Sequence, residues 1–111
     1  MNWNITYYNE TLQEEVLNLP AGIQARYVHL TKRMCIHGAN LGMPHTKAMK
    51  DGLFELRMKS KEGIGRVFYC TLVNKKIMML HCFIKKTQKI LPSDLKLAIS
   101  RMKEVKANAD T

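Results

Sequence analysis

Two arginines, Arg57 and Arg66, have the clearest capacity in this sequence for chemistry on a phosphate. Arg57 lies in a stretch whose apolar and polar residues alternate as in a β-strand, Arg66 begins a second predicted strand, and a short turn separates the two. A guanidinium group binds phosphate oxygens bidentately and stabilises the negative charge that develops when a phosphodiester is cleaved. Taken alone, each arginine also fits a structural role in a surface ion pair of small energetic value.

Further candidates lie on both sides of these arginines. His45 is in a loop with Gly and Pro, and an imidazole moves protons near neutral pH. Strand alternation predicts that His81, Phe83 and Lys85 share one side of a strand, where they suit proton transfer, base stacking and phosphate contact. The alternative is that His81 and Phe83 belong to the core. The other predicted RNA contacts are lysines, namely Lys47, Lys50, Lys59 and Lys86.

Motifs for other chemistries are missing from the sequence. The four histidines lack metal-ligand spacing, and there is neither an acid-rich loop nor a glycine-rich phosphate loop. We therefore expect no metal and no cofactor. Metal-free RNA cleavage remains possible, because the RNA supplies its own 2′-hydroxyl as nucleophile and the protein orients, moves protons and neutralises charge. The three cysteines, without a CxxC pair, predict free thiols and a cytoplasmic location.

The charge of the chain is strongly positive and unevenly distributed. The 111 residues carry a formal net charge of +9. Residues 43–90 hold eleven Lys and Arg against three Asp and Glu, whereas residues 1–42 sum to zero. Such a field favours a polyanionic partner, with a lysine-rich solvated face as the plainer alternative. The charge pattern therefore places the expected contact surface in the middle segment.

The hydrophobic pattern predicts one α+β domain over residues 1–111, with elements in the order β-α-α-β-β-β-α. A strand at 3–8 precedes a short helix that ends at Pro20 and a longer helix that ends at Gly38. A loop at 38–51 leads to three strands at 53–59, 66–73 and 77–84, and a last helix begins at Pro92. We expect an antiparallel sheet with helices packed on one face, the other face being open to solvent or a ligand. No stretch is long and apolar enough for a membrane span.

Several segments in this order resemble the HigB-like, phage-derived branch of the RelE/ParE toxin superfamily. They are 52–57 (GLFELR), 65–69 (GRVFY) and 80–89 (LHCFIKKTQK), followed by Pro92, Ala98 and Arg101. Each motif is weak by itself, but the set has the order and spacing of that branch. The resemblance covers nearly the whole chain and implies a RelE-like fold.

The resemblance implies the toxin of a type II toxin–antitoxin system. Such toxins are ribosome-dependent mRNA endoribonucleases that cut the message in the A site of the 30S subunit without a metal, and a helix-turn-helix (HigA-like) antitoxin neutralises them. Arg57 matches a catalytic basic residue and Arg66 the arginine at the scissile phosphate. Lys85 and Lys86 match the basic pair after the last strand, and His45 lies near a loop position that holds an acid/base residue in some relatives.

The sequence departs from that pattern in two places. Glu55 stands where RelE itself has a basic residue, and the end of the chain, 106–111, lacks the aromatic residue or histidine of several active relatives. Two alternatives therefore accompany the nuclease hypothesis. One is a non-catalytic, ParE-like inhibitor of DNA gyrase, and the other is an inactive phage-derived remnant that binds nucleic acid.

Overall fold

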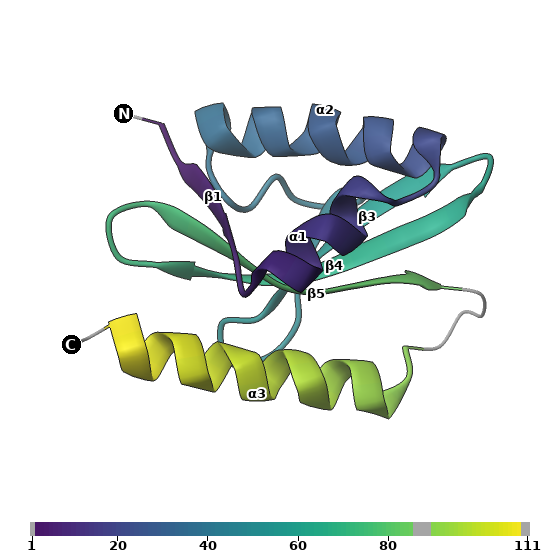
Figure 1. Cartoon of the computed structure of the whole chain (residues 1–111). Helices are drawn as coiled ribbons and strands as arrows, with labels where there is room; N and C mark the ends of the chain where they lie inside the picture. Colours follow the sequence, from purple (N-terminus) through teal and green to yellow (C-terminus); the bar gives the residue numbers. More distant parts are fainter. Residues whose placement is uncertain (1, 86–89, 110–111) are drawn as a thin grey trace.

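The chain folds into a five-stranded sheet with helices above and below it, as the computed structural model shows (Figure 1). The structure describes residues 2–85 and 90–109. The elements are β1 (Asn4–Tyr7), α1 (Glu10–Leu17), α2 (Ala21–His37), β2 (Thr46–Ala48), β3 (Phe54–Ser60), β4 (Gly63–Leu72), β5 (Lys76–Lys85) and α3 (Pro92–Ala109). Within this described part, no helix is long and apolar enough to cross a bilayer.

Local signals fix the ends of the first two helices, as the sequence predicts. The side chain of Asn9 caps α1 by accepting a hydrogen bond from the Leu12 N–H at 2.8 Å. Pro20 separates the two helices because it has no N–H to donate and its ring fixes φ. Gly38 follows α2 with φ of 111°, a conformation that glycine adopts at little cost. The two helices therefore form a hairpin.

The strands are arranged in the order β1-β5-β4-β3-β2. The antiparallel meander of β3, β4 and β5 is confirmed, and β1 adds a parallel edge strand beside β5. The sequence analysis missed β2, which pairs with Phe54–Leu56 inside the segment predicted as a loop. Its three residues are too few to show an alternation of apolar and polar side chains. Because β2 is so short, β3 has an open edge beyond Leu56.

Helices cover the two faces of the sheet differently. The α1–α2 hairpin packs on one face, as expected, over a core that includes Leu30, Leu56 and Tyr69. The last helix packs on the opposite face, which the sequence left to solvent or a ligand, against Phe68 and Leu80. Figure 1 shows α2 on one side of the strands and α3 on the other. The helix α3 contacts β4 and β5, whereas β3 is contacted by α2 on the other face. On the side of α3, β3 is therefore the strand of the meander that is least covered by helix.

A β-bulge changes which side chains of β5 share a face. The register between β4 and β5 shifts after Phe68, which pairs with His81, because Tyr69 pairs with Met79. Met79 therefore belongs to the core under α2, whereas His81 and Phe83 lie on the face of α3. Strict alternation along β5 would put Met79 on the side of His81, and the bulge is the reason that it does not.

Candidate functional site

Arg57 and Arg66 face each other across two neighbouring strands. They are directly paired in the register of β3 and β4, so their side chains project from the same side of the sheet. Glu55, two residues before Arg57 on β3, projects from this side too. The expectation that the two arginines approach each other is therefore confirmed.

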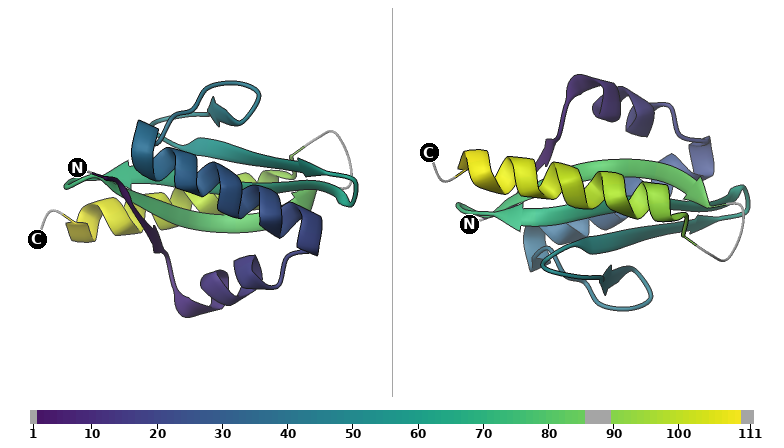
Figure 2. Two further views of the ribbon diagram at one scale, coloured as in Figure 1. Left: turned by 90° about the horizontal axis from the view of Figure 1, so that it is seen from above. Right: turned by 90° about the horizontal axis from the view of Figure 1, so that it is seen from below.

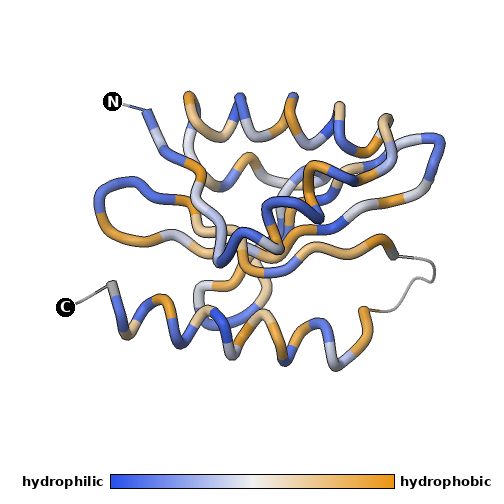
Figure 3. Tube along the Cα trace, in the orientation of Figure 1, coloured by the Kyte–Doolittle hydropathy of each residue, from blue (hydrophilic) through white to orange (hydrophobic). Residues whose placement is uncertain are grey.

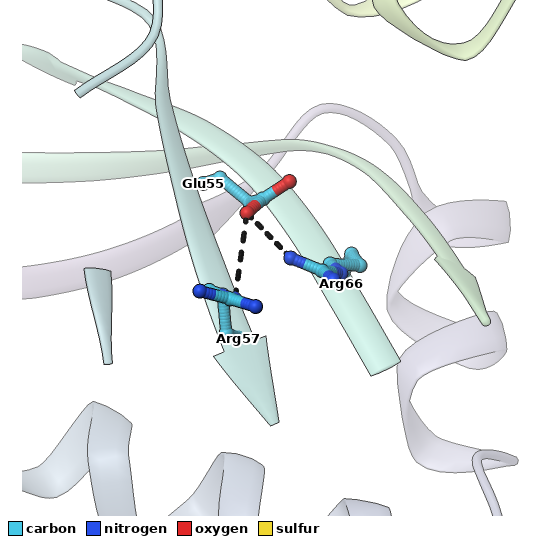
Figure 4. Close-up of polar contacts among 3 residues, drawn as sticks. All are labelled: Glu55, Arg57 and Arg66. Carbon is cyan, nitrogen blue, oxygen red and sulfur yellow. Dashed lines mark hydrogen bonds and ion pairs between the residues drawn. The ribbon is translucent and has the colours of Figure 1, made fainter. Parts of the chain in front are cut away.

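A buried carboxylate joins the two arginines. Glu55 Oε1 accepts a hydrogen bond from Arg66 Nη1 at 2.7 Å and lies 3.8 Å from Arg57 Nε (Figure 4). The side chains of Glu55 and Arg66 are 2% and 5% exposed, whereas that of Arg57 is 30% exposed. Arg66, which the resemblance puts at the scissile phosphate, is thus buried and not exposed, because Glu55 binds it within the protein. Arg57 is the arginine of this pair that reaches solvent.

A pocket lies beside Arg57 at the open edge of β3. Its lining comes from α2, the loop before β2, and strands β3 and β4, namely Arg26, Pro44, His45, Arg57, Lys59 and Ile64. The backbone N–H of Arg57 donates a hydrogen bond to the backbone carbonyl of His45 at 2.9 Å, so the loop occupies the position that a neighbouring strand would take. The pocket therefore brings together two arginines, a lysine and a histidine from three segments of the chain.

The surroundings of His45 favour its neutral form. Partial burial and the positive charges of Arg33, Arg26 and His29 all lower its pKa from the usual 6.5. At neutral pH the imidazole is accordingly mostly unprotonated and can accept a proton. An acceptor of protons thus lies beside guanidinium and ammonium groups that bind phosphate.

Close packing between α2 and the sheet puts Arg26 at this pocket. Gly65 of β4 lies directly under the helix, and a Cβ added to it would lie 2.5 Å from the Ile23 side chain. The Glu62 carboxylate, in the turn between β3 and β4, accepts a hydrogen bond from the Gly22 N–H in the first turn of α2. These two contacts hold the start of α2 above the β3–β4 hairpin.

Neither His81 nor Phe83 lines the pocket, although Phe83 pairs with Arg66 in the register of β4 and β5. His81 Nε2 lies 2.7 Å from the Asp94 carboxylate of α3, and its ring stacks on Phe83 at 5.4 Å. Phe83 in turn packs against Phe68 in the core under α3. These contacts favour the alternative in which both residues are structural.

The predicted lysines are spread along the sheet. Lys47 is exposed on β2 and pairs in register with Glu55, so it projects from the side of the two arginines. Lys50 is exposed in the connection from β2 to β3, and Lys59 lines the pocket. Lys85 ends β5, but its side chain and the whole of Lys86 lie outside the described residues. Among the described residues, no three His, Cys, Asp or Glu side chains are grouped as they would be around a metal ion.

Sequence reasoning missed the contribution of α2. Arg26 lines the pocket, and Arg33 and His29 act electrostatically on His45. The available signal was the spacing of these residues by three and four positions, which puts them on one side of a helix. The zero net charge of residues 1–42 concealed it, because the compensating acids are all on α1.

Fold and pocket define a small α+β domain with a cationic, histidine-containing site at one sheet edge. The family model described as phage-derived protein Gp49-like (DUF891) matches residues 14–103, which is most of the chain. The protein therefore belongs to the Gp49-like family, which is of the RelE/HigB toxin type. No curated protein matches the chain.

Proposed function

We propose that this protein is the toxin of a type II toxin–antitoxin system and cleaves mRNA on the ribosome. The observation that carries the proposal is the pocket at the edge of β3, where a histidine with a lowered pKa lies beside Arg57, Arg26 and Lys59. This set of side chains binds a phosphate and accepts a proton, which are the two tasks of phosphodiester cleavage by an internal hydroxyl. The Gp49-like family supports the same assignment.

In the proposed reaction, the 2′-oxygen of a nucleotide attacks the adjacent phosphorus. His45 takes the proton of the 2′-hydroxyl, the new O–P bond forms, and the bond from phosphorus to the 5′-oxygen breaks. The products are a 2′,3′-cyclic phosphate and a 5′-hydroxyl, whose oxygen receives a proton from solvent or from the histidine. Arg57 stabilises the extra negative charge on the phosphoryl oxygens, and Lys59 and Arg26 hold the neighbouring backbone.

Arg66 has a supporting part in this proposal. It holds the Glu55 carboxylate, and that carboxylate lies 3.8 Å from Nε of Arg57. The pair therefore limits the orientations open to the Arg57 guanidinium. Lys85 pairs in register with Ile64, which lines the pocket, and Lys85 and Lys86 remain proposed phosphate contacts.

Primer extension on translated mRNA after induction of the protein tests the proposal. We expect cleavage within codons for the wild type, and loss of at least two orders of magnitude of cleavage for Arg57→Ala. Lys103→Ala is the matched control, since this exposed lysine lies on α3 and does not line the pocket. Intact transcripts together with growth arrest and accumulated gyrase–DNA complexes would favour the gyrase inhibitor. Intact transcripts with normal growth would favour an inactive remnant.

We further propose a helix-turn-helix antitoxin as the partner that silences the toxin. An acidic partner gains most by covering part of segment 43–90, where the positive charge concentrates. Co-expression with the neighbouring reading frame should restore growth, and the protected amides in hydrogen exchange should include that segment. Protection confined to residues 9–38 would contradict this assignment of the interface.

A further inference from the structure

The helix α2 carries positive charge without any acidic residue. Its seventeen residues include Arg26, His29, Lys32, Arg33 and His37 and no Asp or Glu. The acids of the N-terminal region, among them Glu14 and Glu15, are on α1 instead. Figure 2 shows α2 lying across the sheet between α1 on one flank and the loop that contains β2 on the other. The two flanks of α2 therefore differ in their electrostatic surroundings.

Three of these basic residues form a row along the flank toward the pocket. His29 follows Arg26 by three positions and Arg33 follows His29 by four, so the three lie one above another on the helix surface. The row extends over about 10 Å of helix at 1.5 Å per residue. The side of the helix next to the row is anchored in the core by Tyr27 and Leu30.

The row is continuous with the pocket. Arg26 lines the pocket with His45 and Arg57, and a shallow hollow beside it is lined by Arg26, His29 and Lys59. At the other end of the row, Arg33 lies near enough to His45 to act on its charge. Cationic side chains therefore lead from the middle of α2 to the edge of β3 without an interruption.

We infer that Arg26, His29 and Arg33 form a track for the phosphate backbone of single-stranded RNA, along which the strand reaches the pocket. The inference rests on the proposed function for the identity of the strand as substrate. A single strand carries one negative charge per nucleotide, so two arginines spaced along a helix, with a hydrogen-bonding histidine between them, match its repeating phosphates over a few nucleotides. The track binds backbone, and it therefore adds affinity without choosing a base sequence.

Binding of a cleavage-resistant RNA tests the track apart from catalysis. The probe is a fluorescent single-stranded RNA of about twelve nucleotides with 2′-O-methyl groups, which removes the attacking hydroxyl, and the readout is anisotropy with the purified full chain over a series of salt concentrations. For Arg33→Gln we expect three- to tenfold weaker binding near 0.1 M salt and a salt slope smaller by about 0.7. Lys103→Gln is the matched control.

The control removes one positive charge from a surface that the track does not use. Lys103 is exposed on α3, which packs on the opposite face of the sheet from α2. We expect Lys103→Gln to bind within twofold of the wild type. Equal losses in both variants, or none for Arg33→Gln, would overturn the track, as would an Arg33 effect found with poly-glutamate but not with RNA.

These results separate the inference from the proposed function. If the wild type binds RNA through Arg33 but leaves translated mRNA intact, the track stands and the nuclease assignment fails. If mRNA is cleaved while Arg33→Gln binds RNA like the wild type, the nuclease stands and the track is refuted.

Discussion

Replacement of Glu55 by Ala should destabilise the protein strongly, because it leaves the Arg66 guanidinium buried without its counterion. The side chain of Arg66 is 5% exposed, and its contact with Glu55 is 2.7 Å long. Breaking a buried ion pair from one side costs about 3–5 kcal/mol. A protein of this size has a free energy of unfolding of about 5–15 kcal/mol, so the variant loses a large share of its stability.

The reverse truncation should cost less. In Arg66→Met the Glu55 carboxylate keeps a second cation, since Arg57 Nε lies 3.8 Å away and its side chain reaches solvent. The double variant Glu55→Leu/Arg66→Met replaces both charges by apolar groups of similar size, and we expect its stability within about 1 kcal/mol of the wild type. The order of stability is thus the double variant, then Arg66→Met, then Glu55→Ala.

Urea denaturation followed by circular dichroism measures these differences. With a denaturant slope of about 1.5 kcal/mol/M, the midpoint for Glu55→Ala should fall by about 2–3 M. A midpoint for Glu55→Ala equal to that of the wild type would refute the buried pair. A double variant less stable than Glu55→Ala would show that the ion pair itself stabilises the fold, beyond each charge neutralising the other, and would refute the prediction.

The packing of α2 on Gly65 and the protonation of His45 can each be tested. Gly65→Ala should lower the free energy of unfolding by about 1–3 kcal/mol, because the new methyl group would displace Ile23; an unchanged melting temperature would contradict the close approach of α2. The rate of RNA cleavage should fall on acidification as His45 is protonated, with the acid limb below pH 6.5. Arg33→Gln removes a cation that lowers this pKa and should move the limb to higher pH, which single-turnover rates on programmed ribosomes would reveal; an unmoved limb would mean that another group is the base.

Much of the fold is encoded in short stretches of sequence. Asn9, Pro20 and Gly38 act on the backbone of their own neighbours, so the helix limits follow from residue type alone. The alternation in β3 likewise sorts Leu56 from Arg57, since period two is a property of every strand. The pairing of β1 with β5 and the packing of α3 on the second face are not local, and neither has a signature within its own segment.

The candidate site divides in the same way. The sequence by itself identified Arg57, His45 and Lys59 as cations and proton carriers, because that depends on side-chain chemistry. Only the tertiary structure decided which arginine reaches solvent. Glu55 is eleven positions from Arg66 and meets it by the pairing of β3 with β4. The bulge after Phe68 decides that His81 and Phe83 lie on the face of α3, and the close packing of α2 over Gly65 puts Arg26 at the pocket. Both determine how far a side chain lies from the pocket and on which face of the sheet it stands, and these quantities exist only after the chain has folded.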